Sequence, residues 1–264
     1  MRLFQIDAFT KEVFKGNPAA VCILEEERSD EWLQLLAIEN NLSETAYVVK
    51  KDERYSLRWF TPAKEVPLCG HATLASSFTL FSEGYHNKDL PIHFDTLSGE
   101  LIVQYLPEGK LRMDFPANHA KSLHYDHIQE AEKQFGGDIE EVLIYPDELI
   151  LIFKDVETVL NANPNTDWIS SLATNGVIVS AWSERNDFDF ASRYFAPNLG
   201  IPEDPVTGFM HTILTPYWAD RKNKTTFKAF QASARTGRLE TELIKDRVIL
   251  KGNAVKVFET EINF

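Results

Sequence analysis

The chain has 264 residues, and 40 acidic side chains against 27 basic ones give it a formal net charge of −13 at pH 7. Hydrophobic residues make up 44% of the sequence, enough for a buried core, which excludes a disordered chain. The negative charge disfavours nucleic-acid binding, and the apolar runs are far shorter than the ~20 residues that cross a bilayer. We therefore expect a soluble globular protein with no nucleic-acid and no membrane partner.

The N-terminus and the cysteines indicate the compartment. Apolar and polar residues alternate over residues 1–15, and Asp7 lies where a secretory signal peptide needs an apolar stretch. Cys22 and Cys69 are the only cysteines, too few for a disulfide framework. These features predict a cytoplasmic protein.

Short strands dominate the first half of the chain. Their length and composition predict strands at residues 3–9, 19–24, 44–50, 55–60, 92–95, 100–106 and 111–115. Residues 107–110 (PEGK) predict a hairpin turn. Residues 29–41 predict a helix, because Ser29 can cap it and two acidic residues follow in its first turn.

A second helix is predicted from Gly70 to a stop at Gly84, and nearly all of its residues are apolar or small. A helix without a polar face is usually enclosed on every side, so we expect strands wrapped around it. Residues 208–219 predict a corresponding helix in the second half. Pro216 falls inside that helix and is expected to kink or shorten it.

The two halves of the chain are similar in sequence. Residues 58–62 (RWFTP) are echoed by residues 193–197 (RYFAP), 135 positions later. Two further landmarks, both at an offset of 138 positions, are the glycine pairs Gly70 with Gly208 and Gly99 with Gly237. The period is too long for a solenoid repeat. We expect two domains, residues 1–118 and 119–264, related by an internal duplication with a three-residue insertion.

Gly70 and Gly208 each stand at the start of a predicted buried helix, where a glycine can help to bind a ligand. It lets the backbone approach a ligand closely, and the unpaired N–H groups of the first helical turn attract an anion. The alternative is that both glycines only permit tight turns from strand to helix. We expect two anion sites, with a small carboxylic acid as the ligand.

Glu44 stands at the entrance of the apolar strand predicted at residues 44–50. If Glu44 is partly buried, desolvation would raise its pKa and make it a competent general base. A solvated charge at the rim of the strand is the alternative. His71 directly follows Gly70 and therefore lies in the first turn of the predicted helix.

Asp204 lies between two prolines, four residues ahead of Gly208, which predicts a rigid loop that fixes its carboxylate. A solvent-facing turn is the alternative. His211 lies one turn into the second helix, where a packing role and a ligand role are both open. Glu44, His71, Asp204 and His211 could in principle gather a metal, but no pair has a zinc-type spacing, so no metal is predicted.

Four runs of residues form an ordered set across nearly the whole chain: 16–21 (GNPAAV), 41–46 (NLSETA), 58–62 with 65–73 (RWFTP, EVPLCGHAT) and 203–208 (EDPVTG). As a set they resemble the phenazine-biosynthesis PhzF-like isomerases. The resemblance implies a diaminopimelate-epimerase-like α+β fold: two pseudo-symmetric domains, each a curved, mostly antiparallel sheet wrapped around a central helix, with the active site between them. It also implies a homodimer that needs neither a metal nor an organic cofactor.

The activity characterised in this family is a proton shift on a cyclic, unsaturated amino acid, 2,3-dihydro-3-hydroxyanthranilate. By motif position, the resemblance implies that Glu44 removes a carbon-bound proton, while His71 and Asp204 assist in proton relay and substrate orientation. The substrate-binding positions that it implies are Ser43, Gly70 and Gly208. We thus expect a cofactor-independent isomerase that acts on a small anionic carboxylic or amino acid by general acid–base catalysis.

One departure from the family's motifs and one comparison with other enzymes of the same fold keep alternatives open. Phe209 and Met210 stand where the family has small residues, so the substrate pocket, which we expect Phe209 to line, either takes a different ligand or supports less turnover. A metabolite-binding dimer without turnover is therefore one alternative. Cys69 is matched in the second half by Thr207, as in one-cysteine enzymes of the same fold that dehydrate 3-hydroxyproline. Such a dehydratase is the other alternative, although the two acidic motifs favour the isomerase.

Overall fold

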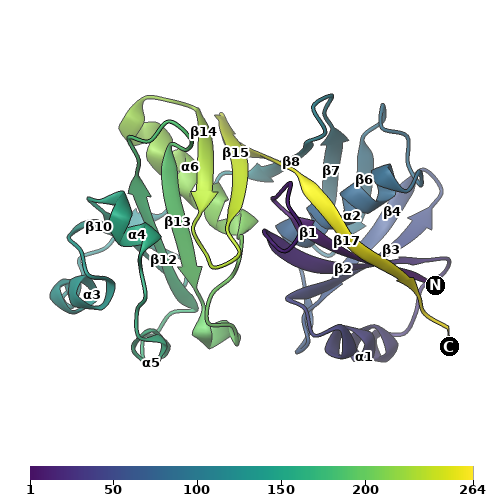
Figure 1. Cartoon of the computed structure of the whole chain (residues 1–264), viewed down its shortest axis with the longest axis horizontal. Helices are drawn as coiled ribbons and strands as arrows, with labels where there is room; N and C mark the ends of the chain where they lie inside the picture. The colour runs from purple at the N-terminus through teal and green to yellow at the C-terminus, as the bar shows by residue number, and fades with distance from the viewer. Residues whose placement is uncertain (264) are drawn as a thin grey trace. The chain divides into compact units, whose positions relative to one another are not determined.

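The computed structural model describes residues 1–263, which fold into two compact units (Figure 1). Unit 1 comprises Met1–Asp114 and the C-terminal segment from Ile249, and unit 2 comprises Phe115–Val248. Strands predominate in both units, as the sequence predicts for an α+β fold.

Unit 1 contains two helices and most of the strands predicted from the sequence. Its helices are α1 (Asp30–Asn40) and α2 (Gly70–Ser82). Its strands are β1 (Arg2–Ala8), β2 (Asn17–Leu24), β3 (Glu44–Lys51), β4 (Arg54–Phe60), β5 (Glu65–Val66), β6 (Ile92–Thr96), β7 (Gly99–Tyr105), β8 (Leu111–Pro116), in which the chain passes into unit 2, and β17 (Ala254–Glu261).

Unit 2 contains the remaining elements. Its helices are α3 (Ile128–Phe135), α4 (Val156–Leu160), α5 (Thr166–Ser170), the 3₁₀ turn η1 (Pro197–Leu199) and α6 (Gly208–Lys222). Its strands are β9 (Lys121–Ser122), β10 (Ile139–Tyr145), β11 (Glu148–Phe153), β12 (Gly176–Trp182), β13 (Phe190–Phe195), β14 (Thr226–Gln231), β15 (Gly237–Ile244) and β16 (Arg247–Gly252), in which the chain returns to unit 1.

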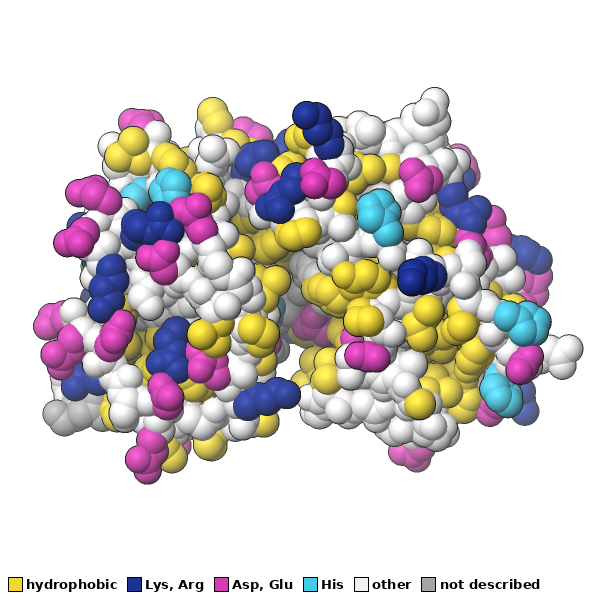
Figure 2. Space-filling model, turned by 180° about the vertical axis from the view of Figure 1, so that it is seen from behind, with side chains coloured by type: hydrophobic (Ala, Val, Ile, Leu, Met, Phe, Trp, Pro, Cys, Tyr) yellow, Lys and Arg dark blue, Asp and Glu magenta, His cyan; other side chains and the backbone are white. Residues whose placement is uncertain are grey.

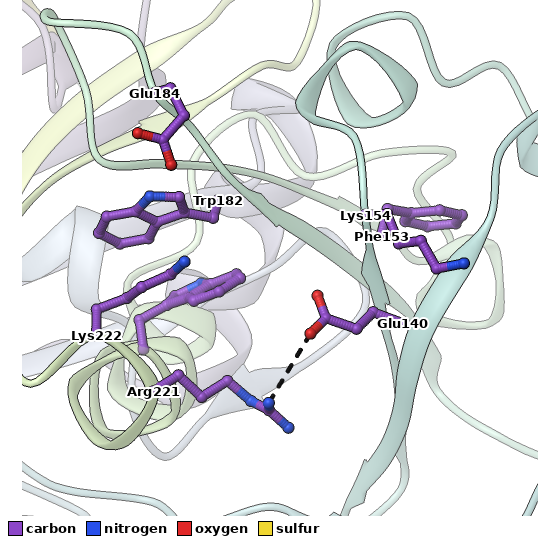
Figure 3. A pocket seen from close by; sticks show the side chains of 8 residues that line it. Glu140, Phe153, Lys154, Trp182, Glu184, Arg221 and Lys222 are labelled. Atoms are coloured by element: carbon purple, nitrogen blue, oxygen red, sulfur yellow. Dashed lines mark ion pairs between the residues drawn. The ribbon is translucent and has the colours of Figure 1, made fainter.

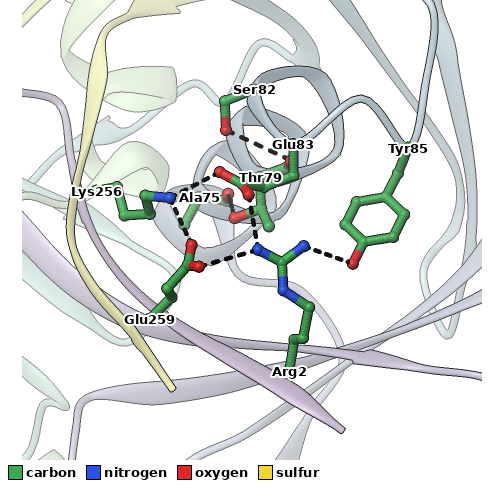
Figure 4. A network of polar contacts seen from close by, with 8 residues as sticks. All are labelled: Arg2, Ala75, Thr79, Ser82, Glu83, Tyr85, Lys256 and Glu259. Carbon is green, nitrogen blue, oxygen red and sulfur yellow. Dashed lines mark hydrogen bonds and ion pairs between the residues drawn. The ribbon is translucent and has the colours of Figure 1, made fainter. Parts of the chain in front are cut away.

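The C-terminal strand lies in unit 1, which differs from the predicted division after residue 118. Strand β17 pairs antiparallel with β1 along the whole length of β1. A charged network adds to this pairing: Arg2 on β1 and Lys256 on β17 both bind Glu83, which follows helix α2, at 2.9 Å each (Figure 4). Arg2 also donates a hydrogen bond to the hydroxyl of Tyr85. The chain end is therefore held by the first strand and by the end of α2.

The order of strand pairings repeats in the two units. In unit 1, β1 pairs antiparallel with β2, β2 parallel with β3, β3 antiparallel with β4, β4 parallel with β6 and β6 antiparallel with β7. Strands β10 to β15 of unit 2 follow the same series. This repetition agrees with the predicted internal duplication.

The strand register shows in more detail than the sequence comparison where the two halves of the chain differ in length. Tyr55 pairs with Phe94 in unit 1, and Phe190 pairs with Ala229 in unit 2, so both strands keep an offset of 135 positions. The offset is 138 at the start of the central helix, which lies between these two strands in the sequence (Gly70 and Gly208). It is 138 again at the glycine that begins the following strand (Gly99 in β7 and Gly237 in β15). The two halves therefore differ by compensating length changes in several loops, rather than by the single insertion expected.

Helix α2 is buried, as its composition predicts, and packs against β1, β2, β3, β7 and β17. Its small polar residues tolerate burial because each hydroxyl donates to the carbonyl four residues earlier. Those residues are Thr73, Ser76, Ser77 and Thr79. Of the helices within residues 1–263, none combines the length and the hydropathy that crossing a membrane requires.

Helix α6 is the counterpart of α2, and Pro216 does not shorten it: the helix extends three residues beyond the predicted end at residue 219. A proline has no N–H to donate to the carbonyl four residues earlier, here that of Thr212. The backbone N–H of Asn118 donates to this carbonyl instead, at 3.0 Å. Because the carbonyl is satisfied from outside the helix, α6 continues to Lys222.

Charged side chains are distributed over the surface. Acidic and basic side chains are interspersed on the face of the molecule shown in Figure 2. Many are paired, as Arg54 is with Asp95 and Glu100 at 2.5 and 2.7 Å. Exposed pairs of this kind contribute about 0–1 kcal/mol each, so the stability of the fold comes from its apolar cores.

A buried carboxyl group in unit 2 has no counterpart in the sequence predictions. Glu148 begins β11 and is 5% exposed. It accepts hydrogen bonds from the Asn175 amide at 3.2 Å and the Tyr194 hydroxyl at 3.0 Å. Burial raises the pKa of Glu148 to about 7, against the opposite effect of these two hydrogen bonds.

We expect Glu148 to make the fold less stable as the pH rises. Between pH 4.5 and about 7 the unfolded chain loses this proton while the folded chain keeps it, so the unfolding free energy falls. Relative to the variant Glu148→Gln, the wild type should lose up to about 3 kcal/mol between pH 5 and pH 8, measured by urea denaturation. Parallel pH profiles for the two proteins would contradict this account.

Candidate functional site

Glu44 and Asn17 lie at the same end of unit 1 because their strands are parallel neighbours. Asn17 begins β2, Glu44 begins β3, and the register pairs Ala19 with Glu44. Gly16 makes the approach to β2 possible: its φ is +66°, and a Cβ there would lie 2.1 Å from the carbonyl oxygen of Ala8. Only glycine accommodates such a backbone.

Helix α2 brings His71 and Cys69 to the same place. The Nε2 atom of His71 lies 3.0 Å from Oε2 of Glu44, and neither atom has a hydrogen-bond partner elsewhere within residues 1–263. The contact has the geometry of an ion pair rather than of an aligned hydrogen bond. The other ring nitrogen, Nδ1, lies 3.2 Å from the Asn17 amide and 3.5 Å from Sγ of Cys69. The Glu44 side chain is only 17% exposed, which excludes a fully solvated rim charge.

The electrostatics favour a charged imidazole beside Glu44. Burial alone would lower the pKa of His71, but its interactions with Cys69 and Glu44, of which Cys69 contributes the most, outweigh burial and raise that pKa well above its usual range. Burial also raises the pKa of the Cys69 thiol, while the neighbouring His71 acts in the opposite direction. The carboxylate of Glu44, 3.0 Å from Nε2, is one of the two groups that favour the imidazolium.

Asn17 can match either protonation state of His71. Its amide carries a donor and an acceptor that exchange places when the group rotates by half a turn. The NH₂ group facing Nδ1 suits the neutral ring, and the oxygen facing Nδ1 suits the charged ring. The amide thus provides a hydrogen-bond partner that follows the proton.

The same cluster holds potential metal ligands. Glu44, Cys69 and His71 offer a carboxylate oxygen, a thiol sulfur and a ring nitrogen, all within 4.8 Å of one another. A metal such as zinc would require the thiolate form of Cys69, which its burial disfavours. This cluster differs from the four residues considered in the sequence, Glu44, His71, Asp204 and His211, for which no metal was predicted.

Asp204 lies in a tightly bonded loop of unit 2. Its carboxylate accepts a hydrogen bond from the hydroxyl of Thr207, and its backbone N–H donates to the carbonyl of Tyr194 at 2.9 Å. The neighbouring residue, Glu203, forms a two-pronged ion pair with Arg193 at 2.7 and 3.0 Å. The rigid loop expected from the flanking prolines is thus also held by specific hydrogen bonds.

Three of the predicted substrate-binding residues lie at the starts of the two central helices, and the fourth, Ser43, precedes strand β3. Gly70 is the first residue of α2, with Ser43 immediately before Glu44. Gly208 is the first residue of α6, and Phe209 follows it with its ring 39% exposed, 6.1 Å from the ring of Tyr145. The substrate-binding role of these four residues stays a prediction.

His211 has a packing role. It is fully buried, its Nδ1 donates to the Thr207 carbonyl at 2.8 Å, and its ring packs against Phe190. Burial lowers the pKa of His211 to about 4, so the ring is neutral at physiological pH.

The sequence predictions missed two residues of these clusters. Asn17 was quoted within a motif but received no role, because nothing local shows that it contacts His71, 54 positions away. Gln231 received none either, although it is fully buried and hydrogen-bonded to the Asp204 loop. Both contacts join residues far apart in the sequence, where no spacing rule applies.

Unit 2 has a cavity of about 390 Å³, which is lined by residues outside the clusters described above (Figure 3). The ammonium group of Lys222 already lies over the ring of Trp182, 4.5 Å from its centroid. Arg221 approaches Glu140 at 4.0 Å on another side. None of the residues predicted to act in catalysis lines this cavity.

Comparison with known proteins identifies the family. The model of the PhzC-PhzF family, described as phenazine biosynthesis-like proteins, matches residues 6–260. The chain belongs to this family. An uncharacterized isomerase of Pseudomonas aeruginosa is 45% identical over 96% of this chain and 95% of its own length. The human phenazine biosynthesis-like domain-containing protein is 38% identical over 97% of each chain.

Solved structures confirm the fold. A PhzF-family protein of Enterococcus faecalis superposes with a TM-score of 0.93 at 42% identity, covering 100% of this chain and 99% of that one. A probable proline racemase of Agrobacterium radiobacter shares the fold alone, with a TM-score of 0.65 at 9% identity over 99% of this chain and 92% of that one. The predicted family, its isomerase class and the diaminopimelate-epimerase-like fold are thereby confirmed.

We expect the pKa of His71 to depend on Glu44. In the variant Glu44→Gln one of the two groups that raise this pKa is lost while burial remains, so the pKa of His71 should fall. A pH titration of the ring signals by NMR measures both values. The exposed Glu53, in the turn between β3 and β4, provides the control variant Glu53→Gln, which should leave the pKa unchanged. An unaltered titration in Glu44→Gln would contradict the assigned ion pair.

Proposed function

We propose that this protein is an isomerase that shifts a proton between carbon atoms of a small carboxylic acid, with Glu44 as the base. The observation that carries this proposal is the contact of the Glu44 carboxylate with the buried His71 ring at 3.0 Å. This contact fixes the carboxylate beside a group that can carry a positive charge, and a carboxylate in that place can accept a proton.

The reaction needs no group from outside the chain. Glu44 takes a proton from a carbon next to the substrate's carboxyl group, and the electron pair of that C–H bond enters an enolate-like system. The imidazolium of His71 and the N–H groups in the first turn of α2 would stabilise the negative charge that develops. Return of the proton to a different carbon completes the isomerisation with no net change in atoms or electrons.

Asp204 is proposed as the second acidic group of the reaction. Its loop fixes the carboxylate, and α6 begins four residues later with Gly208, whose position suits the binding of an anionic substrate. The exposed ring of Phe209 would offer an apolar surface to the substrate. Family members that bind a planar, unsaturated acid would need such a surface, so we place this substrate class first.

The remaining parts of the proposal rest on the family resemblance. They are a homodimeric assembly, a cytoplasmic location and catalysis without a metal or organic cofactor. A one-cysteine dehydratase is less favoured, because burial raises the pKa of the Cys69 thiol and so disfavours the thiolate. A metabolite-binding protein without turnover stays the other alternative and is separated by the experiment below.

We expect the wild-type protein to incorporate deuterium from heavy water into at least one member of a panel of small unsaturated carboxylic and amino acids. Glu44→Gln should lower the rate of incorporation by at least a hundredfold while changing binding little, since the amide keeps the shape of the side chain but cannot accept the proton. Mass spectrometry measures the label, and a thermal shift measures binding.

The control variant Glu53→Gln should exchange at the wild-type rate. A Glu44→Gln protein that exchanges as fast as the wild type would disprove the role of Glu44. A wild-type protein whose melting temperature rises with an acid that never takes up label would instead support the binding protein.

A further inference from the structure

Gln231, the last residue of β14, connects to the Asp204 loop through both ends of its amide. The oxygen Oε1 accepts a hydrogen bond from the backbone N–H of Thr207 at 2.7 Å. The nitrogen Nε2 donates to the carbonyl of Asp204 at 2.8 Å and to the hydroxyl oxygen of Thr207 at 3.2 Å. The side chain is fully buried, so no water competes for these contacts.

These contacts leave one arrangement of donors and acceptors. A backbone N–H can only donate, so the amide atom facing Thr207 N must be the oxygen, and the nitrogen must face Asp204 and the Thr207 hydroxyl. The hydroxyl oxygen then accepts from Nε2, and its single proton points away from Gln231. That proton is donated to Oδ2 of Asp204.

We propose that Gln231 is a positioning residue that acts through Thr207: it directs the Thr207 hydroxyl proton onto Asp204 and so holds this carboxyl group ionised and in one orientation. A carboxylate accepts this hydrogen bond more strongly than a neutral carboxyl group does, so the arrangement favours the charged form. This inference rests on the proposed function in one respect, namely that Asp204 takes part in catalysis.

Other contacts hold the loop in place independently of Gln231. The hydroxyl of Ser233 donates to the carbonyl of Pro205 at 2.7 Å, and the backbone of Asp204 is bonded to Tyr194. Arg193 holds the preceding Glu203. Changing the amide at position 231 should therefore affect the charge and orientation of Asp204 more than the course of the loop.

Two substitutions interrupt the connection at different points. In Gln231→Glu the new carboxylate can accept from both the N–H and the hydroxyl of Thr207, which turns the hydroxyl proton away from Asp204. In Thr207→Val the hydroxyl is absent, and the shape of the side chain is kept. Thr207→Ser keeps the hydroxyl and is the matched control. Thermal denaturation checks that every variant folds.

The experiment is an NMR titration of the Asp204 side-chain carbonyl carbon in protein carrying ¹³C-labelled aspartate, with Asp204→Asn to assign the signal. We expect the titration midpoint to move to higher pH by about one unit in both Gln231→Glu and Thr207→Val, and to stay in place in Thr207→Ser. Unchanged midpoints in both Gln231→Glu and Thr207→Val would overturn the proposal.

A double variant, Gln231→Glu with Thr207→Val, separates the effect of the hydroxyl from that of the charge added at position 231. If Gln231 acts through Thr207, the midpoint shift of the double variant should lie below the sum of the two single shifts. Strictly additive shifts would show that the new charge acts directly, and would overturn the proposed route. Because this titration uses no substrate, it gives its result even if no acid takes up deuterium, so the two proposals can fail separately.

Discussion

The contact between Glu44 and His71 is the interaction on which the candidate site depends. Each group is largely buried, and a buried charge without a partner would cost several kcal/mol. The two charges compensate each other only because parallel pairing of β2 with β3 and the packing of α2 deliver them to the same point. The raised pKa of His71 depends in part on this contact, and the amide of Asn17 faces the other nitrogen of the same ring.

The two units use one scaffold for different electrostatic environments. Each has a two-pronged arginine–glutamate pair ahead of its central helix: Arg58 with Glu65 in unit 1, and Arg193 with Glu203 in unit 2. The histidines that follow differ. His71 faces a carboxylate, and its pKa is raised, whereas His211 lies among neutral groups, and its pKa is lowered to about 4. In unit 2 an acidic group lies on the loop instead, at Asp204, where its carboxylate accepts a hydrogen bond from the Thr207 hydroxyl.

Local features of the fold could be predicted from the sequence, since they depend on neighbouring residues. Ser29 caps α1 by accepting from the N–H of Trp32, and Gly109 forms the predicted hairpin turn with a φ of +79°. The composition of α2 predicted its burial. Features that depend on distant residues could not be predicted in this way. The N–H of Asn118 donates to the carbonyl that Pro216 leaves unpaired, that of Thr212. Strand β17, near the end of the sequence, pairs with β1 at its start.

The residues of the candidate site also divide into those that motifs predict and those that depend on distant contacts. Glu44, His71 and Asp204 were found because they lie within recognisable motifs, but Asn17 and Gln231 act across 54 and 24 positions or more. The most direct test of the central claim is a crystal structure of the protein with an acid that takes up deuterium. The account predicts that the exchanging carbon lies within about 3.5 Å of a Glu44 carboxylate oxygen. A bound acid whose exchanging carbon faces another side chain, with Glu44 out of reach, would contradict it.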